Sequence, residues 1–155
     1  MITDQTRILI LCTGNSCRSQ MAEGLFRFHL LERGVDEAAA GVRSAGIETH
    51  GLNPKAVAAM AERGIDISHH QSTNLREYLT DRFDYIITVC DNAAERCPSF
   101  PGGGERLHWP FDDPARAVGS EAEIAAQFAL IRDRIEARIV EWLDRQMAGS
   151  GLTRP

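Results

Sequence analysis

Eight residues near the start of the chain, Cys12-Thr13-Gly14-Asn15-Ser16-Cys17-Arg18-Ser19, combine a nucleophile with groups that bind anions. A short apolar run precedes them and a helical pattern begins at Gln20, so they form a loop between a strand and a helix. Backbone N–H groups in such a loop, together with the helix N-terminus, bind tetrahedral oxyanions. The Arg18 guanidinium and the Ser19 hydroxyl favour a thiolate, so we expect the pKa of Cys12 to lie below its usual value of about 8.5. The loop is therefore predicted to bind an oxyanion that Cys12 attacks.

A general acid is predicted at Asp112 or Asp113, which lie directly before Pro114. A carboxylic acid placed beside the loop would protonate the oxygen that leaves when Cys12 attacks. Asp113 is the better candidate because the following proline limits its backbone freedom. Asp112 stays as the alternative, and an ordinary turn with no catalytic role is the other interpretation.

Cys90 and Cys97 distinguish between two kinds of chemistry. Phosphoryl transfer needs no further thiol, whereas arsenate is a similar oxyanion that two thiolates can reduce by two electrons. In this hypothesis Cys12 attacks arsenic while Asp113 protonates the leaving hydroxide, and Cys90 then attacks the sulfur of Cys12 and releases arsenite. Cys97 moves the disulfide to the Cys90–Cys97 pair, which a reductant must open. The alternative is that both thiols are small apolar filler.

The spacing of Cys90 and Cys97 makes a structural demand. Seven helical residues span about 10.5 Å, beyond the ~7 Å limit for bridged Cα atoms. If residues 91–96 are helical, they must therefore unwind when the disulfide forms. Pro98 and the glycines at 102–104 favour such a movement because they interrupt regular structure.

Four predicted strands alternate with helices along the chain. The strands are expected at residues 8–11, 42–46, 83–90 and 106–109, and the helices at 20–33, 54–64 and 120–148, with a short helix at 75–79. This alternation predicts an α/β fold, a single-domain parallel four-stranded sheet with helices on both faces. Cys12, Cys90 and the Asp112-Asp113 pair all follow strands, so they should meet at the carboxyl edge of the sheet.

Composition limits the environment and the partners. A chain of 155 residues is expected to form one domain over residues 1–155. Its net charge of -5 predicts no affinity for nucleic acid or anionic membranes, and no leader or membrane span is recognised. A cytoplasmic location and a monomer are therefore expected, with four free thiols and no structural zinc. The adjacent His69 and His70 are interpreted as solvated or capping residues.

Several segments resemble thioredoxin-coupled arsenate reductases of the low-molecular-weight tyrosine phosphatase fold. The matching segments are Leu11 to Gly24, Ser44 to Gly51, Val89-Cys90, Cys97-Pro98, His108-Trp109 and Phe111 to Ala115. The resemblance implies the strand order 2-1-3-4. It also implies arsenate as substrate, phosphate or sulfate as analogues, and thioredoxin as reductant, although glutathione or mycothiol systems serve related enzymes.

The same resemblance implies roles for individual residues. Cys12 is the nucleophile, Arg18 the oxyanion binder, Ser19 the thiolate stabiliser and Asn15 the loop organiser; Asp113 is the acid, Cys90 and Cys97 are the relay, and Cys17 is not required. Some relatives bind potassium through groups that match Asn15, Glu23 and Ser44 together with a carboxylate at position 73. Because Thr73 carries no carboxylate, no metal or cofactor is expected.

Three functions remain open at this point. The first is arsenate reduction, with residual phosphatase activity. The second is a low-molecular-weight tyrosine phosphatase that forms a cysteinyl-phosphate, but Ala115 replaces the tyrosine usual after Asp-Pro in that family. The third is a protein that only binds an oxyanion, which would need neither the acid nor the additional thiols.

Overall fold

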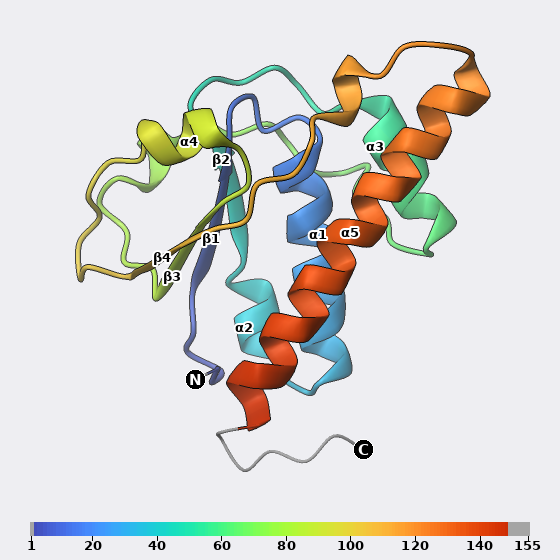
Figure 1. Cartoon of the computed structure of the whole chain (residues 1–155). Coiled ribbons are helices and arrows are strands. Elements are labelled where there is room, and N and C mark those ends of the chain that lie inside the picture. The colour runs from blue at the N-terminus through green and yellow to red at the C-terminus, as the bar shows by residue number, and fades with distance from the viewer. Residues whose placement is uncertain (1, 149–155) are drawn as a thin grey trace.

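Residues 2–148 are described in a computed structural model of the chain (Figure 1). A sheet of four parallel strands lies at its centre: β1 (Ile8–Cys12), β2 (Arg43–Gly46), β3 (Tyr85–Thr88) and β4 (Glu105–His108). The strands lie in the order β2-β1-β3-β4, which confirms the predicted fold class and strand order. All five residues of β1 are buried, as expected for a central strand covered on both faces.

Helices cover both faces of this sheet. They are α1 (Arg18–Glu32), α2 (Asp36–Ala40), α3 (Pro54–Glu62), α4 (Asp91–Glu95) and α5 (Glu121–Ala148), with 3₁₀ turns η1 (Leu75–Tyr78) and η2 (Pro114–Arg116). Figure 1 shows α1, α3 and α5 together on one side of the sheet and α4 on the other. The side chain of Asn53 caps α3, and Ser120 and Glu123 form the predicted capping box of α5.

Strand register brings the predicted chemical groups to one edge of the sheet. Cys12 pairs with Gly46 at the end of β2, and Thr88 pairs with Leu11 and with His108. The carboxyl ends of β1, β3 and β4 therefore lie together, and the segments that follow them begin at this edge.

An aromatic cluster fixes the position of the segment after β4. Trp109 stacks on Phe26 of α1 with ring centroids 6.0 Å apart, and Trp142 of α5 contacts both rings edge-on. The guanidinium of Arg138 lies 5.3 Å from the centroid of the Trp109 ring. These large buried side chains hold the start of residues 109–113 against α1, which begins at the predicted oxyanion loop.

Some boundaries differ from those the sequence predicts. Helix α1 begins at Arg18 rather than Gln20, β3 covers only Tyr85–Thr88 of the predicted 83–90, and α2 lies where no pattern was recognised. α2 is only five residues long, too short to show helical periodicity. The pattern of the last predicted helix ends at residue 148, so fraying is expected from Gly149 onward; those residues lie outside the described part of the chain. No helix within residues 2–148 is apolar and long enough to span a membrane.

Candidate active site

The loop between β1 and α1 presents its N–H groups because its carbonyl groups are used elsewhere. The carbonyls of Cys12, Thr13, Gly14 and Ser16 accept hydrogen bonds from backbone N–H groups of residues 47–53. Within residues 2–148, no backbone N–H from Gly14 to Cys17 donates a hydrogen bond. With the N-terminus of α1 beside them, these free donors form a cradle for a tetrahedral oxyanion.

Asn15 organises the loop from its buried interior. Its backbone has φ 48°, the left-handed conformation that asparagine tolerates better than most residues. Its side-chain amide donates to Ser19 Oγ at 2.7 Å and to Ser44 Oγ at 3.0 Å. The side-chain oxygen, Oδ1, accepts from Thr73 N at 2.8 Å and from the Gln20 side chain at 3.1 Å. Because every polar atom of this side chain has a partner, the loop has one preferred shape.

A buried polar network continues from the loop along α1. Ser44 Oγ donates to Glu23 Oε1 at 2.6 Å, and Glu23 Oε2 pairs with Arg27 at 2.9 Å. The ring of His70 contacts Gln20 Oε1 at 2.9 Å and lies 3.6 Å from Glu23. The interpretation of His70 as solvated or capping is therefore wrong, because its side chain is 6% exposed and belongs to this network.

The residues that match the potassium ligands of related proteins do not fit that ion here. Ser44 joins Asn15 and Glu23 through direct hydrogen bonds, so the three side chains satisfy one another. The fourth position, Thr73, is a hydroxyl that contacts the carbonyl of Gln71 at 3.4 Å and brings no negative charge. Within residues 2–148, no three His, Cys, Asp or Glu side chains are grouped to hold a metal ion.

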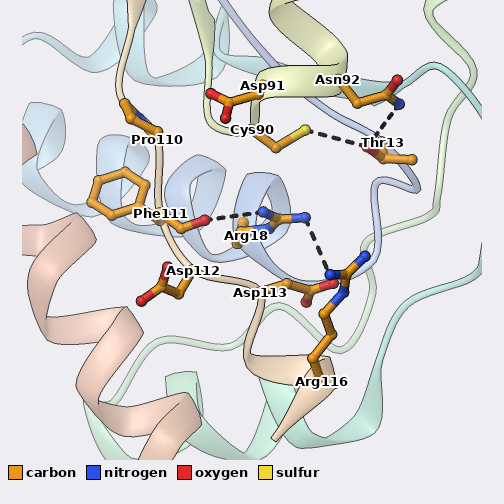
Figure 2. A pocket seen from close by; sticks show the side chains of 10 residues that line it. All are labelled: Thr13, Arg18, Cys90, Asp91, Asn92, Pro110, Phe111, Asp112, Asp113 and Arg116. Atoms are coloured by element: carbon orange, nitrogen blue, oxygen red, sulfur yellow. Dashed lines mark hydrogen bonds and ion pairs between the residues drawn. The ribbon is translucent and has the colours of Figure 1, made fainter.

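Arg18 joins the loop to the segment that follows β4. Its guanidinium donates to the carbonyl of Phe111 at 3.0 Å and lies 3.7 Å from Asp113 Oδ2 (Figure 2). Only 12% of its side chain is exposed, so the positive charge is held in one place at the mouth of the loop. The sequence assigned Arg18 to oxyanion binding, and the structure places it where an anion in the cradle would meet it.

Two cavities meet at this site. One of about 790 Å³ is lined by residues of the loop, α4 and the segment after β4, including Arg18, Cys90 and Asp113 (Figure 2). The other, of about 260 Å³, reaches Cys12 and also contains Arg18 and Asp113. Asp112 lines only the first of these two and points away from Arg18 in Figure 2. Of the two candidate acids, Asp113 is thus the one that shares a cavity with Cys12.

Cys12 and Cys90 alter each other's pKa. Cys90 Sγ lies 3.2 Å from Thr13 Oγ1 of the loop. Hydrogen bonding with the Cys12 thiol is the main cause that lowers the pKa of Cys90 to about 5. Hydrogen bonding with Cys90 and burial raise the pKa of Cys12, although Arg18 opposes them.

This arrangement differs from the sequence prediction for Cys12. Arg18 lowers the pKa of Cys12 as expected, but the neighbouring Cys90 thiol and the loss of hydration raise this pKa by more. Cys17, the other cysteine of the loop, is buried and its pKa is raised, mainly by burial. Its sulfur is correspondingly a poor nucleophile at neutral pH.

Cys97 lies apart from the other thiols. It is half-buried beyond α4 and lines a separate cavity of about 130 Å³ with residues of β3, α4 and β4. Burial raises its pKa, while the nearby Arg106 opposes the increase. The structure therefore brings Cys12 and Cys90 together and leaves Cys97 outside both cavities at the loop. All four cysteines are free thiols.

Sequence reasoning missed several groups at the site. Asn92 of α4 donates to Thr13 Oγ1 at 3.1 Å and fixes the hydroxyl that contacts Cys90. His50 lies against Gly14, where an added Cβ would be 2.3 Å from its Nδ1, and Arg116 lines both cavities. The position of His50 inside a segment similar to known reductases was the available signal. Asn92 and Arg116 carried none, because their contacts depend on long-range packing.

Comparison with known proteins agrees with this geometry. Residues 7–150 match the family model for low molecular weight phosphotyrosine protein phosphatase. An arsenate reductase of Halalkalibacterium halodurans is 51% identical over 132 residues, 85% of this chain and 91% of that protein. An arsenate reductase of Bacillus subtilis is 48% identical over 137 residues, 88% of this chain and 94% of that protein.

Solved structures give the same picture. An arsenate reductase in an oxidized state has a TM-score of 0.71 and 26% identity, and it covers 87% of this chain and 94% of its own. The tyrosine phosphatase Wzb from Escherichia coli K30, in complex with sulphate, has a TM-score of 0.73 with 20% identity. The match covers 94% of this chain and 99% of that one. The second likeness concerns the fold alone.

Proposed function

The protein belongs to the low molecular weight phosphotyrosine protein phosphatase family, and from this premise we propose that it reduces arsenate to arsenite. The observation that carries the proposal is the position of Cys90, whose sulfur lies at the oxyanion loop, in contact with Thr13 and with the Cys12 thiol. Hydrolysis of a phosphate ester has no use for a second thiol at this point. Relatives at 48–52% identity that are named arsenate reductases support the proposal.

Substrate binding and the first bond formation use the loop. Arsenate enters the cradle, where the free N–H groups and Arg18 bind its oxygens. In this proposal Cys90 accepts the proton of Cys12, which leaves Cys12 as the thiolate that attacks arsenic. Asp113, 3.7 Å from Arg18, protonates the hydroxide that leaves as water. The product of this step is an arsenic–sulfur bond on Cys12.

Reduction follows by two thiol exchanges. Cys90 releases its proton to solvent and, as thiolate, attacks the sulfur of Cys12; the electron pair of the arsenic–sulfur bond stays on arsenic, which leaves as arsenite. Cys97 likewise loses its proton to solvent and attacks Cys90 as a thiolate, and Cys12 departs as a thiolate. The two electrons that arsenic gains come from the Cys90 and Cys97 thiols, which end as a disulfide. Cys97 reaches Cys90 only if α4 unwinds, because its five helical residues hold the two apart.

A reductant from outside the chain must reopen the Cys90–Cys97 disulfide. We assign this role to thioredoxin, which fits a product disulfide formed between two cysteines on one segment that can move. No cofactor enters the cycle. The enzyme is proposed to act as a monomeric single domain in the cytoplasm, where reducing conditions keep the four thiols free.

The second candidate is hydrolysis of phosphate monoesters through a cysteinyl-phosphate. It is favoured by the family and by the combination of cradle, Cys12, Arg18 and Asp113, which suits phosphate as well as arsenate. Ala115 lines the inner cavity where phosphatases of this fold carry a tyrosine, so no aromatic wall is available there for a phenyl ring. We therefore expect phosphatase activity only as a weak side reaction.

Arsenate-dependent NADPH oxidation in the presence of thioredoxin and thioredoxin reductase tests the proposal. Cys12→Ser, Cys90→Ser and Cys97→Ser should each abolish turnover. Phosphate binding measured by calorimetry is the control for an intact oxyanion loop. Cys97 lies outside both cavities at the loop, so Cys97→Ser should bind phosphate like the wild type. Absence of arsenate-dependent NADPH oxidation by the wild type, together with full hydrolysis of a phosphate monoester by Cys90→Ser, would instead assign the protein to the phosphatases. The turnover rates of Asp112→Asn and Asp113→Asn, compared in the same assay, show which carboxyl is the acid.

A further inference from the structure

Strand β4 contacts both ends of the segment that carries Cys90 and Cys97. At the first end, His108 Nε2 lies 2.8 Å from Oδ1 of Asp91, which is the first residue of α4. At the other end, Arg106 donates to the carbonyl of Cys97 at 3.3 Å and to the carbonyl of Pro98. Two side chains of one strand thus hold the two ends of the segment.

The contact at the first end is oriented by a third residue. His108 Nδ1 lies 2.8 Å from Thr88 Oγ1 on the neighbouring strand β3. With the Thr88 hydroxyl as donor to Nδ1, the neutral ring carries its proton on Nε2 and donates it to Asp91. Protonated His108 also donates to Asp91, so this contact persists in both forms of the ring. Thr88 is buried, which fixes the ring from the sheet side.

The contacts of Arg106 and His108 with the segment both come from strand β4. Residues 106 and 108 are two apart in a strand, so their side chains emerge on the same face, about 7 Å apart. A cavity of about 130 Å³ is lined by Ala94 and Cys97 of the segment together with residues of β3 and β4, among them Arg106 and His108. The two ends of the segment are hydrogen-bonded to β4, while Ala93 in its middle is buried in the core.

Disulfide formation between Cys90 and Cys97 conflicts with a helical segment between them. A helix continued from Cys90 to Cys97 would place the two Cα atoms about 10.5 Å apart, beyond the ~7 Å that a disulfide allows, and α4 covers Asp91–Glu95 of this span. Unwinding of α4 would shift Asp91 and Cys97, the residues that contact β4. The hydrogen bonds of Arg106 and His108 thus belong to the dithiol form.

We propose that Arg106 and His108 are positioning residues that clamp the Cys90–Cys97 segment in its dithiol form. This inference rests on the proposed relay. Because the clamp stabilises the dithiol, it makes the disulfide easier to reduce and so raises its reduction potential. The clamp keeps the two thiols apart until Cys90 has reacted with Cys12, and it favours return of the segment once the reductant has opened the disulfide.

Thiol–disulfide exchange measures the clamp without arsenate. In a Cys12→Ser/Cys17→Ser background only Cys90 and Cys97 can pair, and the protein is equilibrated with reduced and oxidised dithiothreitol. The protein disulfide forms by passing two electrons and two protons to oxidised dithiothreitol. Arg106→Gln/His108→Ala should increase the equilibrium constant for oxidation about tenfold, which corresponds to a potential ~30 mV more negative. Each single variant should give part of this shift.

Two matched variants control for unrelated effects. Glu105→Gln changes an exposed residue of the same strand whose side chain has no hydrogen bond or ion pair to residues 90–98 in the described part of the chain, and it should leave the potential unchanged. His108→Gln keeps an N–H group able to reach Asp91, so its shift should be smaller than that of His108→Ala. Circular dichroism of the dithiol forms verifies that each variant is folded.

The outcomes separate the clamp from the relay. Equal potentials for the background protein and Arg106→Gln/His108→Ala, with the Cys90–Cys97 disulfide confirmed by peptide mapping, would overturn the clamp and leave the relay intact. Failure of Cys90 and Cys97 to pair even in excess oxidised dithiothreitol would overturn both. A less negative potential in the double variant would also refute the clamp, since it would mean that these side chains favour the disulfide.

Discussion

Gly46 is the position where one added methyl group should disable the site without removing any chemical group. It is the last residue of β2 and pairs with Cys12. A Cβ there would lie 2.3 Å from the carbonyl oxygen of Glu48 and 2.8 Å from both Asn15 N and Thr13 O. Contacts shorter than 3.0 Å are not tolerated, so Glu48 alone must move by at least 0.7 Å, the difference between 3.0 and 2.3.

This displacement reaches the oxyanion loop directly. All three obstructing atoms belong to the backbone, and Glu48 N donates to Thr13 O at 2.8 Å, so the loop must move with its neighbour. A misplacement of about 1 Å at a reacting centre costs roughly 100-fold in rate. Overpacking costs about 1–3 kcal/mol, which lowers the melting temperature of a domain of this size by several degrees.

The assay compares Gly46→Ala with Gly41→Ala. Gly41 ends α2 with φ -87°, and an added Cβ there would have its nearest neighbours at 3.5 Å, so this control should keep wild-type values. We expect kcat/KM for arsenate to fall about 100-fold in Gly46→Ala. Phosphate affinity measured by calorimetry should weaken in parallel. Wild-type turnover and phosphate binding by a folded Gly46→Ala would refute the packing of β2 against the loop.

Three further predictions follow from the site and its surroundings. Cys90→Ala should lower the pKa of Cys12, because the hydrogen bond and the charge of Cys90 both raise it; the pH dependence of thiol alkylation measures this, and an unchanged or higher pKa contradicts the pairing. Asp113→Asn should reduce kcat for arsenate by about 10²–10⁴, and a decrease below threefold in steady-state assays would exclude it as the acid. Away from the site, Glu136 of α5 pairs with Arg63 and His29, and Glu136→Gln should lower the melting temperature at neutral pH by about 1–3 °C. Because hydrogen bonds, chiefly from Arg63, lower the pKa of Glu136, this difference exists above its ordinary pKa and should vanish as acid protonates the carboxylate; a difference that persists in acid contradicts the ion pair.

Much of the fold could be predicted from local patterns. The apolar β1 segment, the cap at Asn53 and the capping box at Ser120 each carry a signal within a few residues, and the structure has an element at each place. Helix α2 could not be predicted because its five residues are held mainly by packing on α1. Strand β3 ends at Thr88, before the predicted end. Val89 N still donates to Leu11 O of β1, but Val89 O accepts from Phe111 N of the segment after β4, and the Cys90 side chain contacts Thr13 of the loop.

The site residues, like the elements of the fold, could be predicted where the signal is local and could not where it depends on distant segments. Cys12, Arg18 and Asp113 could be proposed because each lies in a short segment with a chemical reason for its residue types, and the three side chains line one cavity. The pKa of Cys12 was predicted in the wrong direction because the thiol beside it comes from a residue 78 positions away, and no local pattern places it there. His70 was misjudged for a similar reason, since its partners Gln20 and Glu23 lie on α1. Contacts between distant segments decide both cases.

The most direct test of the three-thiol relay is peptide mapping after a single turnover. Wild-type protein, fully reduced and mixed with one equivalent of arsenate in the absence of any reductant, should yield one equivalent of arsenite and a disulfide between Cys90 and Cys97. Cys97→Ser under the same conditions should stop at a disulfide between Cys12 and Cys90. If arsenate is left unreduced and all thiols of the wild-type protein remain free, the account of this protein as a thiol-relay arsenate reductase is wrong.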